Sequence, residues 1–451
     1  MLNFLKTRMK AFTLSEVLIA LVIIGVVAAI TIPLTIANYN EAEKIAKIKK
    51  TYSTLNNAIS LSIVNGGTDI FDVTANDFKT VQKYFDEYLK DRLVATKVCY
   101  NKKGCWHEGD TKELNGKNTV YYNRTGVVGR NILKILEENN VEFEDIKFLA
   151  SKKSAGKELY FKGNKYTIIE ATPEAFEGIN IVLASAGGST SLALAQEAVK
   201  RGCVYIDNSS AFRMDNDVPL VIAGVNDEDI RTHKGIIANP NCSTSQLMLV
   251  LKPLHDYAKI KRMIVSTYQS VSGAGLAAIN ELKESTIAAN EGKTYENKVF
   301  KKPIAYNCIP QIDSFCDNGY TKEEMKVTNE TRKILHLEPN TPISCTAVRV
   351  PVFVGHSEAV TVEFENEITP EDARELLKDA WGVEVIDDVE NYEFPTAVMA
   401  AGKNPVYVGR IRKDIAFDNA ISFWCVADNL RIGAALNTVR IAEKVIEMQV
   451  F

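Results

Sequence analysis

The sequence predicts an α/β protein with two unlike parts. In the longer part, short apolar runs typical of buried strands alternate with helical patterns, at Ile146–Ala150, Ile179–Ala184, Val204–Ile206 and Ile236–Ala238. This alternation is typical of a parallel sheet with crossover helices. In the shorter N-terminal part, an apolar run extends from residue 17 to residue 37, which is long enough to cross a bilayer as a helix.

The overall composition sets broad limits on function. The 451 residues, 46% of them hydrophobic, are enough for two or three domains with full cores. The net charge is -4 and the pI is about 5.9, so there is no basic excess of the kind that favours nucleic-acid binding. Of the eight cysteines, only Cys99 and Cys105 lie close together, and they could form a bridge if that segment is exported. Elsewhere we expect a reducing compartment and no metal site.

A leader-like pattern precedes the apolar run. Residues 1–10 are basic, and Ala11–Glu16 brings one acidic residue to the start of the uncharged span. This pattern resembles the type IV prepilin leader. The resemblance implies cleavage after Ala11, methylation of Phe12, and pairing of Glu16 with the N-terminus of a neighbouring subunit. An ordinary signal anchor is the alternative.

The pilin-like part is expected to extend to about residue 118. An amphipathic helix is expected over residues 41–63, and residues 64–118 resemble a truncated pilin head. Residues 17–37 would then form a single-pass membrane anchor, in the form of a transmembrane pilin-like helix.

A glycine-rich turn opens the longer part. Thr125–Arg130 precedes an amphipathic helical pattern, and such a turn can hold a pyrophosphate because its N–H groups point at the phosphates. A plain helix start is equally consistent with this turn alone. Two later loops favour the cofactor. Ala184–Ser189 ends a strand with a second close-approach turn, and the basic Ser151–Gly156 suits a 2′-phosphate. We therefore expect a Rossmann-type domain that binds NADP rather than NAD, with a solvated surface pair as the alternative for the two lysines.

The first turn departs from the usual pattern. Asn123 stands where a first glycine is expected, Arg124 takes a position that is usually small, and the preceding strand at 118–122 is polar. Asn tolerates positive φ, so the turn can still form. We expect weaker cofactor binding than in a version with an apolar strand and a glycine at position 123.

One cysteine has the setting of a nucleophile. Cys242 lies in Asn239–Gln246, a loop that ends in the first turn of a helix, and Asn241 is one candidate N-cap. A thiol at a helix N-terminus faces unpaired N–H groups and the positive end of the dipole, which stabilise a thiolate and can hold an oxyanion. We expect a low thiol pKa. A small buried hydrophobe is the alternative reading of this cysteine.

From residue 123 to residue 451 the chain resembles the aspartate-semialdehyde dehydrogenase family. The matching blocks, in order, are Thr125–Gly129, Asp207–Asp215, Asn239–Thr244, Tyr268–Gly275, Arg349–Val352, Gly355–Ser357 and Asp428–Arg431. The resemblance implies a Rossmann-type NADP-binding domain over 119–250 and an α+β catalytic and dimerisation domain over 251–426. It also implies a last helix, 427–448, that returns to the first domain, and assembly as a homodimer or a dimer of dimers.

The resemblance also implies a reaction. NADPH reduces L-aspartyl 4-phosphate to L-aspartate 4-semialdehyde with release of phosphate, through a thioester, in lysine, methionine and threonine biosynthesis. Cys242 would be the nucleophile, because sulfur attacks acyl carbon well and leaves well. His356 would move protons, and Gln269 would orient the acyl intermediate.

Further residues are assigned by the same resemblance. Arg349 would bind the substrate α-carboxylate, Glu323 the α-ammonium, and Lys326 the phosphate, together with Arg213 and Asn241. From spacing alone, Glu323 and Lys326 fit a surface salt bridge. Lys153 replaces a usual Arg, and Ala223–Asn226 departs from the usual loop. The cofactor would contact Thr125, Gly126, Val127, Val128, Lys153, Ser154, Gly187, Gly188, Ser272, Gly273 and Asn429.

Two alternatives stay open. An N-acetyl-glutamyl-phosphate reductase is the first, and the set of Glu323, Lys326 and Arg349 argues against it because an acetylated amine needs no carboxylate partner. A type IV pilin or pseudopilin subunit with an enzyme-like passenger is the second. A pilin anchor would place the following domain outside the cytoplasm, whereas the enzyme is expected inside it. We therefore hypothesise a fused or misassembled reading frame.

Overall fold

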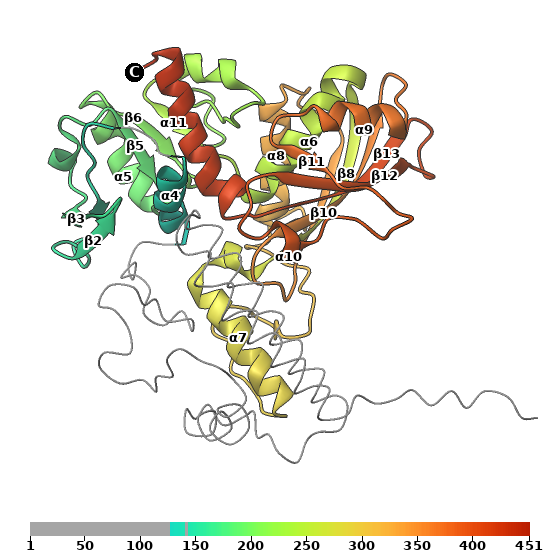
Figure 1. Cartoon of the computed structure of the whole chain (residues 1–451), viewed down its shortest axis with the longest axis horizontal. Coiled ribbons are helices and arrows are strands. Elements are labelled where there is room, and N and C mark those ends of the chain that lie inside the picture. The colour runs from blue at the N-terminus through green and yellow to red at the C-terminus, as the bar shows by residue number, and fades with distance from the viewer. Residues whose placement is uncertain (1–126, 140–142) are drawn as a thin grey trace, which may run out of the picture. The chain divides into compact units, whose positions relative to one another are not determined.

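The computed structural model describes residues 127–139 and 143–451 (Figure 1). The chain divides into two compact units, Met1–Thr119 and Val120–Phe451, and every described residue belongs to the second. The predictions for the leader, the membrane helix, the pilin-like head and the turn at 123–126 therefore lie outside the described residues.

The first part of the described chain is built on a parallel sheet of three strands in the order β5-β6-β7. The alternation seen in the sequence predicts this arrangement, which the structure confirms. Its elements are α4 (Val127–Glu138), β1 (Leu149–Ala150), β2 (Glu158–Phe161), β3 (Asn164–Thr167), β4 (Ile169–Glu170), η2 (Pro173–Phe176), β5 (Ile181–Ala184), α5 (Gly188–Val199), β6 (Val204–Asp207), η3 (Asp227–Thr232) and β7 (Ile236–Ala238).

One predicted strand is much shorter than its apolar run. The run at Ile146–Ala150 forms a strand only at its last two residues, because its partner β4 offers only Ile169 and Glu170 for parallel pairing. The hairpin of β2 and β3 follows β1, and its inner side chains Leu159 and Phe161 are buried.

The second part of the described chain is a mixed six-stranded sheet in the order β11-β12-β13-β10-β8-β9. The pairs β8–β9 and β11–β12 are parallel and the others are antiparallel. Its elements are α6 (Cys242–Ala258), β8 (Ile260–Gln269), η4 (Val271–Ala274), α7 (Leu276–Asn290), α8 (Lys322–Ile334), β9 (Ile343–Arg349), β10 (His356–Phe364), α9 (Pro370–Lys378), β11 (Val383–Val385), α10 (Ala397–Ala400), β12 (Val406–Lys413), β13 (Ala420–Ala427), the π-helical turn η5 (Arg431–Ala435) and α11 (Leu436–Met448).

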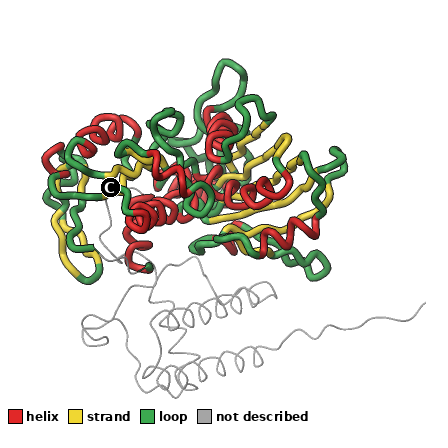
Figure 2. Tube along the Cα trace, turned by 90° about the horizontal axis from the view of Figure 1, so that it is seen from above, coloured by secondary structure: helices red, strands yellow, loops and turns green. Residues whose placement is uncertain are grey.

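Helices cover one face of the larger sheet. α6 packs against β8, β10, β12 and β13, while α8 contacts β9 and α9 contacts β11 and β12 (Figure 2). In the described part of the chain, the other face presents Ile264 and Tyr268, which are 45% and 37% exposed. The Tyr268 ring also lies 5.4 Å from that of Trp424 on β13.

The last helix packs against the first sheet. Ile441 and Val445 of α11 share a buried cluster with Val204, Ile206 and Ile237 of that sheet. The helix starts later than the predicted residue 427, which still belongs to β13. Asp428 begins the turn between them, because its carboxylate accepts a hydrogen bond from the N–H of Leu430 at 2.8 Å.

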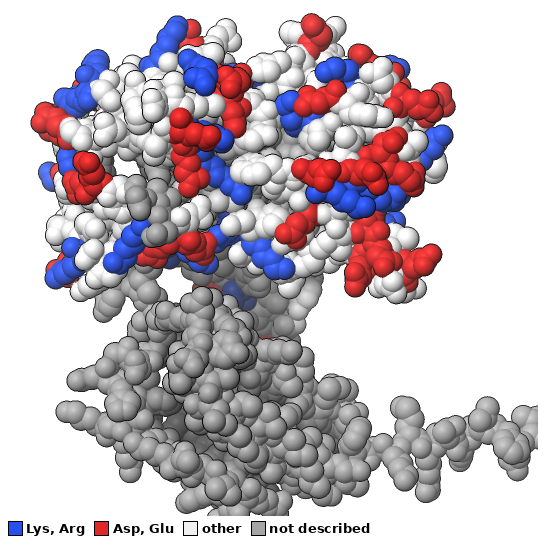
Figure 3. Space-filling view, turned by 45° about the horizontal axis from the view of Figure 1, so that its top comes forward, with Lys and Arg blue, Asp and Glu red and all other residues white. Residues whose placement is uncertain are grey.

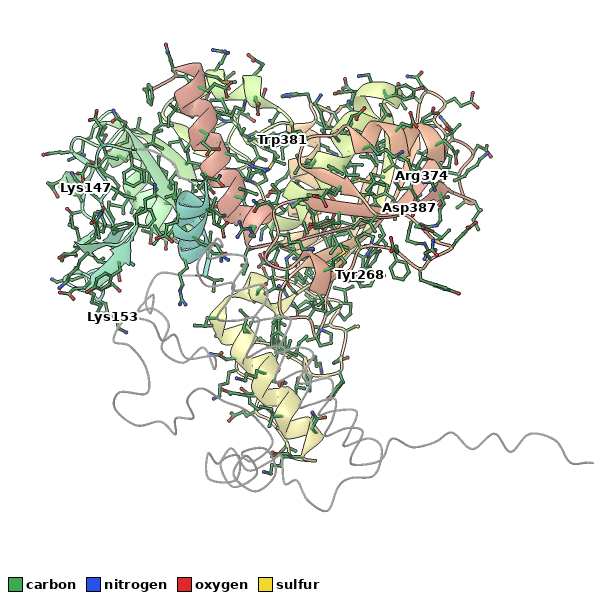
Figure 4. All side chains as sticks on the ribbon, in the orientation of Figure 1. Lys147, Lys153, Tyr268, Arg374, Trp381 and Asp387 are labelled. Carbon is green, nitrogen blue, oxygen red and sulfur yellow. The ribbon has the colours of Figure 1, made fainter. Side chains whose placement is uncertain are left out.

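The two parts also meet at Trp381. A side-chain Cβ at Gly224 would clash with the Trp381 ring, and Gly224 has a φ of +84°. The Arg440 guanidinium of α11 lies 4.1 Å from the centre of the same ring (Figure 4). The departure at Ala223–Asn226 therefore includes a glycine that the local backbone and the Trp381 contact both require.

Two further properties concern the surface. No helix among residues 127–139 and 143–451 is long and apolar enough to cross a membrane. On the face drawn in Figure 3, acidic and basic side chains are interspersed over both parts.

Candidate active site

Cys242 is the first residue of α6. Asn241 caps this helix, because its Oδ1 accepts a hydrogen bond from the backbone N–H of Ser243 at 3.0 Å. Further along the helix, Leu247 and Leu251 are fully buried against the larger sheet, which holds the helix start in place. The Cys242 side chain is left partly exposed at this end.

The His356 imidazole lies against the sulfur. Its Nε2 is 3.3 Å from the Cys242 Sγ, and the ring is completely buried. On the other side of the ring, Nδ1 accepts a hydrogen bond from the backbone N–H of Ser270 at 3.1 Å. The Ser270 hydroxyl oxygen is also 3.1 Å from Nδ1. The ring is thus held from both sides, at the start of β10 between β8 and β13.

Glu323 connects α8 to the nucleophile. Its Oε1 accepts hydrogen bonds from Asn241 Nδ2 at 2.8 Å and from Gln269 Nε2 at 3.1 Å. Its Oε2 pairs with Lys326 Nζ at 3.0 Å, and Lys326 pairs also with Asp313 at 2.9 Å. Glu323 is buried, so this pair is not the exposed surface salt bridge that spacing alone suggests.

A capping box places α8. The Thr321 hydroxyl accepts a hydrogen bond from the N–H of Glu324, and the Glu324 carboxylate accepts one from the N–H of Thr321. The second Glu324 oxygen accepts a hydrogen bond from the N–H of Ala347 on β9 at 3.0 Å. The first turn of α8 is therefore fixed to the sheet, and Glu323 with it.

A third buried acid on α8, Glu330, contacts the residues of the predicted phosphate site. Glu330 Oε1 pairs with Arg213 Nη1 at 3.1 Å, and Glu330 Oε2 accepts a hydrogen bond from the backbone N–H of Asn241 at 2.7 Å. Arg213 Nε also donates to the Asn239 carbonyl at 2.9 Å. Glu330 lies seven residues after Glu323, on the same side of the helix. That spacing is the sequence signal that could have identified it.

Arg349 lies at the end of β9 and donates from Nη1 to the Ser270 carbonyl at 2.7 Å. Gly273 faces the same space. A side chain there would place its Cβ 3.2 Å from Arg349 Nη1 and 3.3 Å from His356 Nε2. The glycine therefore keeps room open between a cation and the imidazole.

The pKa values of Cys242 and His356 differ from what the sequence predicts. Burial, and then the Glu323 carboxylate, raise the pKa of the Cys242 thiol to about 12, although Arg349 and Arg213 act in the opposite direction. Burial and Arg349 hold the pKa of His356 well below its usual value. The expected low thiol pKa is therefore wrong for the ligand-free site. Desolvation outweighs the helix end, and Asn241 already caps the N–H of Ser243.

The charges on α8 are retained despite burial. Burial alone raises the pKa of Glu323, but Lys326, Asn241 and Gln269 together hold it below its usual value. Burial alone lowers the pKa of Lys326, but Glu323 and Asp313 hold it above its usual value. Glu323 is therefore a carboxylate and Lys326 an ammonium group at neutral pH.

The start of α5 fits a dinucleotide phosphate. Gly187 caps this helix without a side-chain hydrogen bond, and no atom of residues 127–139 and 143–451 lies within 4 Å of where its Cβ would stand. At Gly188 the nearest atoms to such a Cβ, in Ala211 and Ser209, are 3.9 Å away. Backbone N–H groups at an open helix start are suited to an anion.

Asn429 fits the other end of the cofactor. Its Oδ1 accepts hydrogen bonds from the Ser270 and Ser272 hydroxyls at 3.1 Å and from the N–H of Gly355 at 3.0 Å. Its Nδ2 is buried and has no partner among the described residues. A buried donor next to His356 is suited to a polar group such as a carboxamide.

The remaining predicted cofactor residues are less closely grouped. Val127 and Val128 open α4, and Thr125 and Gly126 lie outside the described residues. Lys153 is exposed and Ser154 is buried in the turn after β1, near the hairpin of β2 and β3 (Figure 4).

A glycine of the π-helical turn packs directly behind the nucleophile. A side-chain Cβ at Gly433 would lie 2.7 Å from the Cys242 Cβ and 3.0 Å from its Cα. The turn is wide because the N–H of Ala435 bonds the carbonyl five residues earlier, at Leu430. Nothing in the sequence indicates that residues 191 positions apart meet here, since only the fold brings η5 to α6.

Family models match both described parts. Residues 124–233 match the semialdehyde dehydrogenase NAD binding domain, and residues 251–432 match the semialdehyde dehydrogenase dimerisation domain. Together with the paired cysteine and histidine, these matches define an oxidoreductase of the two-domain semialdehyde dehydrogenase class.

Individual relatives identify the family within this class of oxidoreductases. The chain is 53% identical to the aspartate-semialdehyde dehydrogenase of Aquifex aeolicus over 336 residues, which are 74% of this chain and 98% of that protein. It is 50% identical to the Bacillus subtilis enzyme of the same name over 336 residues, 73% of this chain and 97% of that one. The chain therefore belongs to the aspartate-semialdehyde dehydrogenase family, which confirms the resemblance in the sequence.

Solved structures of aspartate-semialdehyde dehydrogenases have the same fold as this chain. Aspartate semialdehyde dehydrogenase II of Vibrio cholerae complexed with ASA superposes with a TM-score of 0.69 at 44% identity, over 72% of this chain and 97% of that one. The enzyme of Candida albicans solved with NADP shares the fold, with a TM-score of 0.57 at 24% identity, over 72% of this chain and 97% of that one.

The N-terminal segment has its own match. Residues 6–32 match the prokaryotic N-terminal methylation motif. This match confirms the prepilin-like character of the leader, while the apolar run itself lies outside the described residues.

Proposed function

We propose that this chain reduces L-aspartyl 4-phosphate to L-aspartate 4-semialdehyde, with release of phosphate and oxidation of NADPH, in the route to lysine, methionine and threonine. The observation that supports this most directly is the 3.3 Å contact between Cys242 Sγ and His356 Nε2 at the start of α6. Around it stand Glu323, Arg349 and Arg213, a charge set that complements an amino acid with a phosphorylated side chain.

Cys242 forms the covalent intermediate in this proposal. Its thiolate attacks the acyl carbon, the bond from that carbon to the phosphate oxygen breaks, and phosphate leaves with the bonding pair. Bound NADPH supplies a hydride to the thioester carbon. The C–S bond then breaks, its electron pair returns to sulfur, and the proton consumed overall ends on phosphate. His356 Nε2 is within reach of the sulfur at each of these steps.

The charged groups select the substrate. Arg349 binds the α-carboxylate and Glu323 the α-ammonium, while Lys326, Arg213 and the Asn241 amide hold the phosphate. Gln269 orients the acyl group, and its bond to Glu323 supports this position. Both Glu323 and Arg349 are buried, so in this proposal the charged groups of the substrate meet them away from bulk water.

Substrate binding also activates the thiol. The Glu323 carboxylate is one cause of the raised thiol pKa in the ligand-free site. An ammonium group bound at Glu323 offsets that charge, and the pKa of the Cys242 thiol then falls. The Cys242 thiol is thereby easier to ionise when the substrate is present.

NADP is the proposed cofactor. Gly187 and Gly188 offer the open helix start for a phosphate. Asn429 Nδ2, which has no partner in the described part of the chain, suits the nicotinamide end together with Ser272 and Gly273. The proposed contacts of the 2′-phosphate are Ser154 and the exposed Lys153. Those of the pyrophosphate are Thr125, Gly126, Val127 and Val128.

Replacing the nucleophile tests the proposal. Cys242→Ser should abolish NADPH oxidation with L-aspartyl 4-phosphate, measured by absorbance of the reduced nicotinamide. Cys203→Ser, a change at a buried thiol beside the Phe176 carbonyl, should retain it and serves as the control. Undiminished turnover by Cys242→Ser would exclude the proposal. Faster turnover of N-acetyl-glutamyl phosphate than of L-aspartyl 4-phosphate would favour the related reductase instead.

We further propose that the enzyme part is a homodimer, or a dimer of dimers. The match to a dimerisation domain over 251–432 supports this, as does the exposure of Ile264 and Tyr268 on the face of the larger sheet opposite α6. Light scattering on the purified chain tests it. A Tyr268→Arg variant should dissociate, whereas a monomeric wild type would exclude it.

For the N-terminal segment we propose a prepilin-type leader followed by a membrane anchor at 17–37. The methylation motif at residues 6–32 supports this proposal. The mass of the protein made by its host, with membrane fractionation, tests it. Cleavage after Ala11 and recovery in the membrane are expected, and an uncleaved protein absent from the membrane would exclude it. The enzyme part itself is proposed to act in the cytoplasm, where its substrates are expected.

A further inference from the structure

One residue supplies both contacts on the side of the His356 ring that faces away from the sulfur. The backbone N–H of Ser270 donates to Nδ1 at 3.1 Å, and the Ser270 hydroxyl oxygen is 3.1 Å from the same atom. Both residues are fully buried. A backbone N–H can only donate a hydrogen bond, so in the neutral ring Nδ1 must be the unprotonated, accepting nitrogen.

We propose that Ser270 is a positioning residue that holds His356 in the tautomer with its proton on Nε2, so that the ring meets the Cys242 sulfur and the reacting oxygen as a donor. This inference rests on the proposed function, because it assigns the direction of a hydrogen bond within that reaction.

The hydroxyl of Ser270 is the second contact to Nδ1. It has one hydrogen, which it can donate to Nδ1 of the neutral ring or to Asn429 Oδ1, each at 3.1 Å. With the hydroxyl turned to the ring, Ser270 donates to Nδ1 from both its backbone N–H and its side chain, which fixes the plane of the ring. The backbone N–H at the same time opposes a second proton on Nδ1.

A donor at Nε2 matches what the chemistry needs. Attack on the acyl phosphate and hydride transfer to the thioester both create a negatively charged oxygen on the reacting carbon, and the last step returns an electron pair to sulfur. Each of these charges is stabilised by a hydrogen-bond donor placed beforehand. Nε2–H faces this position, 3.3 Å from Sγ. The Gln269 amide nitrogen is 3.4 Å from the same Nε2, and it donates to Glu323 at 3.1 Å. Gly273 leaves the neighbouring space open for the reacting oxygen.

The tautomer is measured directly by nitrogen NMR. The full chain is labelled with ¹⁵N-histidine, and the His356 signals are identified as those missing from His356→Gln. At pH 8 we expect an unprotonated Nδ1 and a protonated Nε2. A proton on Nδ1 would overturn the inference, and this readout does not depend on turnover.

A variant tests the hydroxyl separately. Ser270→Ala keeps the backbone N–H, so the tautomer should persist, while the ring loses the partner that fixes its plane. We expect kcat with L-aspartyl 4-phosphate to fall about fivefold, as for loss of one neutral hydrogen bond, with KM unchanged. Ser285→Ala is the matched control, because that buried hydroxyl donates to the Leu282 carbonyl within α7, and it should leave kcat unchanged. Wild-type kcat in Ser270→Ala would overturn the role of the hydroxyl.

These outcomes are distinct from those of the proposed function. If the wild type leaves aspartyl phosphate unreduced, the reaction is wrong, yet the NMR result still decides the tautomer. If the wild type reduces it and Nδ1 carries the proton, the reaction stands and the Ser270 inference is excluded.

Discussion

The catalytic centre and the dinucleotide loops use polar groups in opposite ways. Around Cys242, buried side chains are already paired with one another, as Glu323 is with Asn241 and Gln269. At Gly187, by contrast, the helix start has no side-chain cap and open space. In the proposed function, the catalytic groups are thus held in place before the substrate arrives, whereas the proposed phosphate loop relies on backbone N–H groups that a ligand completes. Substitutions should therefore affect the two regions differently.

The largest effect is expected beneath the catalytic centre. Glu358 on β10 is completely buried, and burial raises its pKa to about 8. The native state then keeps a proton that the unfolded chain loses near pH 4.5, so stability from this group is full below pH 4.5 and falls as pH rises to about 8. Glu358→Gln should be more stable than the wild type at pH 8 by about 4 kcal/mol, relative to their difference at pH 4. Urea unfolding at both pH values measures this.

The exposed Glu365, just after the same strand, is the control for that prediction. Glu365→Gln should keep the pH dependence of the wild type. Parallel stability curves for Glu358→Gln and the wild type would mean that Glu358 is ionised in the native state.

A side chain at position 433 should displace Cys242 from its position beside His356. In Gly433→Ala the new Cβ would lie 2.7 Å from the Cys242 Cβ, so one of the two must shift. A displacement of this kind costs about 100-fold in kcat. Steady-state kinetics should show this fall with little change in KM for NADPH. Ala434→Ser, at a partly exposed position in the same turn, is the control and should stay near wild type. A fully active Gly433→Ala would show that the turn tolerates movement.

Removing one charge should separate thiol reactivity from substrate binding. Glu323→Gln takes away a charge that raises the pKa of Cys242, so alkylation of this thiol by iodoacetamide at pH 8 should become about tenfold faster. KM for L-aspartyl 4-phosphate should rise, because the ammonium group loses its partner. Glu338→Gln, an exposed change of equal charge, should alter neither quantity. Slower alkylation in Glu323→Gln would contradict the role given to this carboxylate.

The smallest effect is expected in the open loop. Gly187 has a φ of -71°, and nothing lies within 4 Å of an added Cβ. Gly187→Ala should therefore leave stability unchanged and raise KM for NADPH about threefold, since the methyl group enters the space proposed for the phosphate. KM for the acyl phosphate is the internal reference. An unchanged KM for NADPH would place the phosphate elsewhere.

The sequence predicted the parallel sheet and the position of Cys242 at the start of a helix well, because both depend on local patterns. Apolar runs marked β5, β6 and β7 to within a few residues, and Asn239–Gln246 marked the start of α6. The short β1 was not predicted, because its length depends on what β4 offers for pairing.

The features that the sequence did not predict depend on contacts between residues far apart in the chain. The direction of the Cys242 pKa follows from burial and from Glu323, which is 81 positions away in the chain. Gly433 acts through backbone proximity that has no sequence pattern of its own. Glu330 is a site residue that the sequence could have indicated, because its spacing from Glu323 puts both on one side of α8.

The helix α8 has one more consequence. In the proposed function it bears the partner of the substrate ammonium, Glu323, and a partner of the phosphate, Lys326, and through Glu330 it holds Arg213 as well. Successive residues of a helix rise by about 1.5 Å, so the separation of these groups is set by a rigid rod rather than by mobile loops. If the proposed function holds, these groups form a rigid template, and an acyl phosphate one methylene longer should fit it less well.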